Sequence, residues 1–166
     1  MATSKEKAEF RGLFLGEGYA TICKYKARYK HFHKRKGTLI EKNRIWYRPQ
    51  LSLSQREDNG DMVYWIQKKF GGYVCRRTYF GANGGNPALC WTTTNHELCE
   101  KLCKILLQSS IPSKKLNSVK IVLKYLKLRY KKNDGRRSMG YSEKQNEAFK
   151  RLHLACKQNH AFKVIK

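Results

Sequence analysis

The chain has 166 residues, of which 40% are hydrophobic, so it can bury the core of one ordinary domain. Lys and Arg number 36 against 12 Asp and Glu, which leaves a formal net charge of +24. A surface this basic repels itself unless a polyanion binds it, so nucleic acid is the leading partner and a generic basic fold, such as a ribosomal protein, is the alternative. No run approaches the ~20 apolar residues that span a membrane, and no membrane partner is expected.

Six cysteines occur at irregular spacing, and no signal peptide is recognisable. We therefore expect a soluble protein with free thiols in a reducing compartment. His96, Cys99 and Cys103 could be drawn together as a zinc site on one helix. Because no CxxC pair is present, we do not expect zinc there.

The first half of the chain predicts a helix, a long hairpin and a second helix. Residues 4–18 place Phe10, Leu13 and Phe14 at helical spacing and then reach a glycine. Residues 19–36 and 43–57 alternate as strands do. On the second strand the two sets of alternating residues are Ile45, Tyr47, Leu51 and Leu53 on one side, and Arg44, Trp46, Arg48, Gln50, Ser52 and Ser54 on the other. Residues 59–72 return to a helical period.

The second half predicts a shorter hairpin over residues 72–94 and then helices. A capping box of Thr94 and Glu97 starts the first of these, a second follows Pro112, and a capping box of Ser142 and Gln145 opens the last. This order indicates an α+β fold with helices on one side of an antiparallel sheet. The other side is then free to face a ligand.

The free side of the predicted sheet is strongly basic. Residues 24 to 56 contain eleven Lys or Arg and one acidic residue, Glu41. A basic ribbon interleaved with aromatic residues fits a DNA groove, with phosphates held by Lys and Arg and base edges contacted by Arg, Gln and Ser. The alternative is a solvated basic face. The residues expected at DNA are Lys24, Lys26, Arg28, Lys30, Arg44, Trp46, Arg48, Gln50, Ser52, Arg76, Arg77 and Tyr79, with Arg77 preferred for a base and Arg76 for a phosphate.

The first helix carries small residues every four positions, at Ala8, Gly12 and Gly16. Glycine inside a helix costs ~1 kcal/mol relative to alanine, so we expect another backbone to approach here. The simplest partner is the same helix of a second copy across a two-fold axis, with Gly12, Leu13 and Gly16 at the dimer interface.

Such pairing would bring two Glu17 carboxylates together at the negative ends of two helices. A divalent cation would offset this repulsion, held by Glu17, by the helix-end carbonyl of Gly16 and by DNA phosphate oxygens. Mg²⁺ is expected, with Mn²⁺ or Ca²⁺ able to bind the same site. A metal between carboxylates and a phosphate suits phosphodiester hydrolysis. The alternative is that Glu17 only ends the helix and faces solvent.

The segment FRGLFLGEG, residues 10–18, resembles the motif of the LAGLIDADG homing endonucleases, with Gly12, Leu13, Glu17 and Gly18 at the expected places and Leu15 departing from the pattern. The order of elements over nearly all the chain matches as well. The resemblance implies an αββαββαα fold whose curved antiparallel sheet forms a DNA-binding saddle. It also implies one domain over residues 1–166, with a core at about 5–132 and a C-terminal loop and helix at 133–166. A single motif is typical of the homodimeric branch.

The resemblance also implies further site residues. Gln55 would join the metal and water network, Lys115 would act on the nucleophilic water or the transition-state charge, with Lys114 as a near alternative, and Arg56 would be an accessory phosphate contact. It would send Thr21, Cys23 and Tyr25 to DNA, in conflict with the basic residues between them. A β-bulge near Lys24 would resolve this conflict.

The implied activity is metal-dependent cleavage of both strands of a long, pseudo-palindromic DNA site, as in intron homing. The protein would then act in the compartment that holds this DNA, an organelle or a prokaryotic cytoplasm. Two alternatives stay open: an RNA-binding maturase that serves intron splicing, and a DNA-binding protein or repressor without catalysis.

Overall fold

The computed structural model describes residues 2–33, 37–77, 87–130 and 142–160, with the backbone alone at residues 27, 29–33, 39–44 and 130. Tyr79 and the side chains of Lys30 and Arg44 lie outside this description. The elements are α1 (Ser4–Glu17), β1 (Gly18–His33), β2 (Thr38–Arg56), a 3-10 turn η1 (Glu57–Asn59), α2 (Asp61–Phe70), β3 (Tyr73–Arg77), β4 (Ala88–Thr93), α3 (His96–Leu106), α4 (Lys114–Tyr130) and α5 (Glu143–His160). The predicted α+β order is confirmed.

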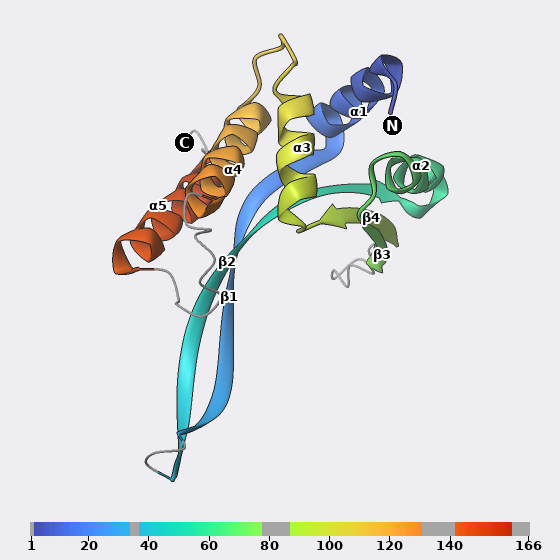
Figure 1. Cartoon of the computed structure of the whole chain (residues 1–166). Helices are drawn as coiled ribbons and strands as arrows, with labels where there is room; N and C mark the ends of the chain where they lie inside the picture. Colours follow the sequence, from blue (N-terminus) through green and yellow to red (C-terminus); the bar gives the residue numbers. More distant parts are fainter. Residues whose placement is uncertain (1, 34–36, 78–86, 131–141, 161–166) are drawn as a thin grey trace, which may run out of the picture.

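The sheet has four antiparallel strands in the order β1-β2-β4-β3. β1 and β2 are much longer than the other two strands, and they project from the body as an arm (Figure 1). Their register runs without interruption from Gly18↔Leu53 to His33↔Thr38. The predicted bulge near Lys24 is therefore wrong, because a bulge would shift this register by one residue.

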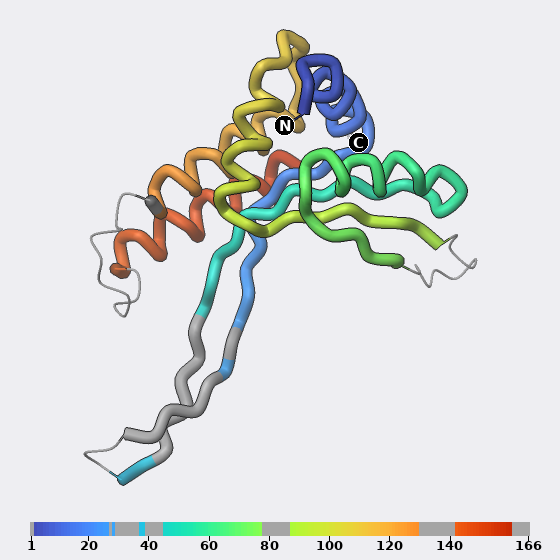
Figure 2. The backbone as a smooth tube through the Cα atoms, turned by 45° about the vertical axis from the view of Figure 1, so that its right-hand side comes forward, coloured from blue at the N-terminus to red at the C-terminus, as the bar shows by residue number. Residues whose placement is uncertain are grey.

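The helices gather on one side of the sheet and leave the other side uncovered (Figure 2). On the covered side Ile22, Leu51, Leu53 and Trp91 are fully buried. For Leu51 and Leu53 the alternation of β2 predicted this side. The indole N–H of Trp91 donates to the carbonyl of Gly71 at 2.7 Å, so this large ring also satisfies its polar atom. The core thus forms between the sheet and the helical layer.

The helix starts show the expected chemistry with one correction. Ser142 and Gln145 form the predicted capping box of α5. The N-cap of α3 is Asn95, whose Oδ1 accepts from the backbone N–H of Leu98 at 3.0 Å. The prediction that Thr94 is the N-cap was wrong by one residue. An Asn side chain caps a helix as well as Thr does, and the backbone enters the helix only after Asn95.

Two global features bear on the class of protein. None of the helices in the described ranges is long and apolar enough to cross a membrane. All six cysteines are free thiols, and burial raises the pKa of Cys99 to about 12 and that of Cys156 to about 11. Cys99 and Cys156 therefore pack in the core rather than act as nucleophiles, because the thiolate is the reactive form.

Candidate catalytic centre and nucleic-acid interface

The candidate catalytic carboxylate, Glu17, lies at the junction of α1 and β1. Phe10 and Phe14 are fully buried and fix the helix, while Glu17 is its last residue and is exposed. Gly18 follows, and a Cβ there would collide with the ring and the carbonyl of Phe14. This glycine therefore lets the chain leave the helix at once, so the carboxylate is held at the helix end. The carbonyls of this last turn have no partner inside the helix.

Lys115 reaches this helix end from the first turn of α4. Its Nζ donates a hydrogen bond to the carbonyl of Gly16, although the two residues are 99 positions apart. The backbone N–H of Lys115 donates to Oγ of Ser113 at 3.1 Å, which fixes the start of α4. The structure thus brings Lys115 beside Glu17 and gives the Gly16 carbonyl a cationic partner. Lys114, the alternative, is exposed.

Gln55 lies near the same junction. It follows Leu53 by two residues on β2, and Leu53 pairs with Gly18, the first residue after Glu17. The side chain of Gln55 is half-buried. Arg56 is exposed and forms an ion pair with Asp58 at 3.1 Å, so part of its charge is already neutralised.

We call the uncovered side of the sheet the open face. The residues on it, by alternation and register, are Thr21, Cys23 and Tyr25 of β1, Trp46, Arg48, Gln50, Ser52 and Ser54 of β2, Cys90 and Thr92 of β4, and Tyr73, Cys75 and Arg77 of β3. Tyr19 of β1 shares this parity and packs against the ring of His160. Within the set, the residues that are buried are Thr21, Ser52, Cys90 and Thr92. The β2 set is the one predicted from sequence. Arg77, preferred for base contact, is on this face. Arg76 is on the opposite side and forms an ion pair with Glu57 at 2.8 Å.

The β1 residues on the open face are those implied by the family resemblance. Lys24, Lys26 and Arg28 have the opposite parity and are exposed on the other side of the arm. Basic alternation had suggested that these three would share the face of Arg48, and the uninterrupted register corrects this. These three residues have the parity that faces the core nearer the start of β1. They can be charged because β1 has left the body at this point and their side chains meet solvent.

Side chains on the open face orient one another. The guanidinium carbon of Arg48 lies 5.5 Å from the centroid of the Tyr25 ring, a cation–π contact. The thiol of Cys23 donates to Oε1 of Gln50 at 2.8 Å. Arg48 and Gln50 are therefore held in place by β1, and the sequence alone indicated neither contact. Arg48 presents a planar donor fork, the group suited to guanine or phosphate.

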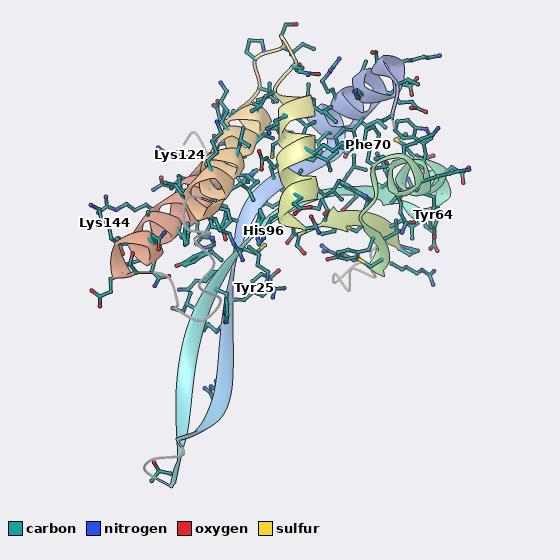
Figure 3. All side chains as sticks on the ribbon, in the orientation of Figure 1. Tyr25, Tyr64, Phe70, His96, Lys124 and Lys144 are labelled. Carbon is teal, nitrogen blue, oxygen red and sulfur yellow. The ribbon has the colours of Figure 1, made fainter. Side chains whose placement is uncertain are left out.

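His96 lies at the border of the open face, at the start of α3 and above Tyr25 on the arm (Figure 3). Nη1 of Arg129 is 2.6 Å from its Nε2. A guanidinium can only donate, so Nε2 carries no proton and the ring is neutral. Burial and the charges of Arg129 and Arg48 lower the pKa of His96 to about 4. His96 thus accepts from Arg129, while the thiol of Cys99, its partner in the zinc alternative, donates to the carbonyl of Thr93.

The outer face of α1 is the second exposed surface of interest, and we call it the α1 seam. Gly12 and Gly16 are exposed, and a Cβ built on either meets no atom within 4 Å in the described chain. Leu13 beside them is half-buried and lines a shallow depression together with Glu9, Met62 and Trp65. Packing inside the chain thus leaves space at both glycines.

Comparison with solved structures identifies the fold. I-SmaMI bound to an uncleaved DNA target in the presence of calcium ions matches with a TM-score of 0.62 and 13% identity, over 94% of this chain and 46% of that one. I-CeuI, a group I intron-encoded homing endonuclease complexed with DNA, matches with a TM-score of 0.57 and 19% identity, over 89% of this chain and 78% of that one. The LAGLIDADG meganuclease I-AabMI bound to uncleaved DNA matches with a TM-score of 0.59 and 13% identity, over 89% and 45%.

The chain has the fold of the LAGLIDADG homing endonucleases, which confirms the resemblance first noted in residues 10–18. It spans about half the length of the I-SmaMI chain. No family model and no curated protein matches the sequence.

Proposed function

We propose that the chain is a site-specific DNA endonuclease that cuts both strands of a long, pseudo-palindromic target as a homodimer. The contact of Lys115 with the carbonyl of Gly16 supports this most directly. It joins two expected catalytic segments at the end of the helix that bears the motif, and neither packing nor helix formation requires a lysine there. The enzyme would act in the compartment that holds its target DNA.

The residues at the end of α1 fit a hard divalent cation. The Gly16 carbonyl already accepts from an ammonium, so the position attracts positive charge, and the exposed carboxylate of Glu17 adjoins it. Mg²⁺, or Mn²⁺ or Ca²⁺ in its place, would polarise the scissile phosphate and lower the pKa of a bound water. Lys115 neutralises charge that develops on the phosphate oxygens, and Gln55 orients the attacking water through its amide.

The proposed homodimer rests on the α1 seam. Two glycines inside a helix are unfavourable unless another backbone approaches, and no atom of the described chain occupies the space above them. A second copy would complete a saddle with two centres, one for each DNA strand.

The open face would contact the target DNA. Arg48, Gln50 and Arg77, which share this face, would contact base edges in the major groove. Ser52, also expected at DNA, is buried on the same face. Lys24, Lys26 and Arg28, on the other side of the arm, are placed for phosphates that flank the groove.

Selection of cleaved sites from a randomised DNA library with Mg²⁺ tests the proposal. We expect Glu17→Gln to bind the selected site and to leave it uncut. Lys115→Met should slow cleavage by about 100-fold or more, the usual cost of one group that stabilises transition-state charge. Lys114→Met, the matched control, should retain nearly full activity. Tight duplex binding without cleavage by the unaltered protein would contradict the nuclease, and a preference for intron RNA would indicate a maturase.

A further inference from the structure

The last turn of α5 connects the two segments that carry Lys115 and Glu17. Nδ2 of Asn159 lies 2.7 Å from the carbonyl oxygen of Lys114 and 2.6 Å from Oγ of Ser118, both in α4. Nε2 of His160 lies 2.9 Å from the carbonyl oxygen of Ala20 in β1 and 3.2 Å from the same Ser118 hydroxyl. Two adjacent side chains of α5 thus bridge the start of α4 to the start of β1.

The geometry defines the donors in this bridge. The carbonyl of Ala20 can only accept, so Nε2 of His160 carries a hydrogen. Ser118 is fully buried, and its oxygen can accept from both Asn159 and His160. The ring of His160 also lies against Tyr19, with the ring centroids 4.1 Å apart. His160 is therefore fixed on two sides and cannot rotate away without losing both contacts.

The residues that the bridge contacts are close in sequence to the two candidate catalytic residues. Lys115 lies between Lys114 and Ser118, the two residues that Asn159 contacts, and Glu17 lies three residues before Ala20. Neither Asn159 nor His160 is among the expected catalytic, metal or DNA-binding residues. Sequence patterns could not indicate them, because their partners are backbone carbonyls and one serine on distant elements.

A second connection between these segments is needed because the hydrogen bond from Lys115 to the Gly16 carbonyl would be weakened when a cation binds. The Gly16 carbonyl that accepts from Lys115 is also the expected metal ligand. A dication held there would repel the ammonium and would weaken the contact that now holds Lys115 at the helix end. The α5 bridge uses other carbonyls and persists.

We propose that Asn159 and His160 are positioning residues that keep Lys115 at a constant distance from Glu17, both in the metal-free protein and when the metal and the DNA are bound. This rests on the proposed endonuclease function. The two side chains do not contact the α1 seam, and His160 meets the open-face parity of β1 at Tyr19, which is not among the residues expected at DNA. Their loss therefore slows cleavage and leaves DNA affinity and dimerisation unchanged.

The test compares single-turnover cleavage with DNA affinity, the latter measured in Ca²⁺. Asn159→Ala combined with His160→Ala should lower the cleavage rate by about 100-fold, the cost of a displacement of about 1 Å in a reacting group, and leave Kd unchanged. His160→Gln, which keeps an N–H donor, should recover most of the rate. Gln158→Ala, on the exposed side of the same turn, is the matched control. Wild-type rates in the double variant, or equal losses of rate and affinity, would overturn the proposal.

A measurement without cleavage separates this proposal from the proposed function. The ¹³C resonance of the Gly16 carbonyl in the metal-free protein should depend on Lys115, with Lys115→Met as the reference for its loss. In the double variant this resonance should move toward the reference. An unchanged resonance would overturn the positioning role whether or not the protein cuts DNA. A shifted resonance in a protein that cuts no site would support the bridge and contradict the nuclease.

Discussion

The α1 seam and the part of the open face that carries Tyr25, Arg48 and Arg77 are both exposed, but they differ in chemistry. The seam has two glycines with free space above them, beside Leu13 and Trp65. The open face has long polar and aromatic side chains that hold one another, such as Arg48 on Tyr25. A surface without side chains lets a backbone approach, whereas an oriented cation attracts an anion. The comparison is consistent with the proposed second copy at the seam and the proposed DNA target at the open face.

The largest effect is expected at the seam. Gly12→Leu should leave the free energy of unfolding of the monomer unchanged or raise it by up to about 1 kcal/mol, because glycine is a poor helix former. The same side chain should weaken the dimer by about 1–3 kcal/mol for each copy, since it separates the two backbones. Sedimentation across a concentration series measures this. Gln158→Leu on α5 is the control, and a dimer of wild-type stability in Gly12→Leu would remove the seam from the interface.

A smaller effect is expected at the open face, and it differs between two arginines. Arg48 lies on the face and, among the described residues, forms no ion pair, whereas Arg76 lies on the opposite side and is paired with Glu57. Arg48→Ala should cost about 1–3 kcal/mol of DNA binding and relax specificity at one base position of each half-site. Arg76→Ala should weaken binding to all DNA sequences equally, and by less than Arg48→Ala weakens binding to the target. Titrations at several salt concentrations distinguish the two, and the reverse ranking would contradict the assignment of faces.

Sequence analysis predicted the order of elements and the faces of β2, because Leu51 and Leu53 alternate strictly with polar residues. It was misled on β1, where Lys24, Lys26 and Arg28 occupy the parity of buried Ile22. That parity is apolar only beneath the helices. Where the strand projects into solvent, charged residues occupy the same parity. No local pattern could therefore indicate where the body ends and the arm begins.

The candidate catalytic centre was predictable to different degrees. Glu17 followed from the helix period, and Gln55 and Lys115 followed from the family resemblance. The structure adds that Lys115 contacts the Gly16 carbonyl. The contacts of Cys23 with Gln50 and of Asn159 with α4 were not predictable, because they depend on register and helix packing across many residues.

The smallest effect concerns His96, at the border of the open face. Its pKa is about 4 in the folded protein against 6.5 for the free side chain, so the unfolded chain binds more protons between these values and stability falls as the pH falls through this window. After allowance for solvent screening we expect about 1 kcal/mol. Urea unfolding of His96→Gln, which keeps an acceptor for Arg129, should show a pH dependence reduced by this amount. Lys101→Gln on the same helix is the matched control and should retain the wild-type slope. An unaltered slope in His96→Gln would mean that His96 is as basic in the folded protein as in the unfolded chain, and that the positive charges of Arg48 and Arg129 do not act on this border of the open face.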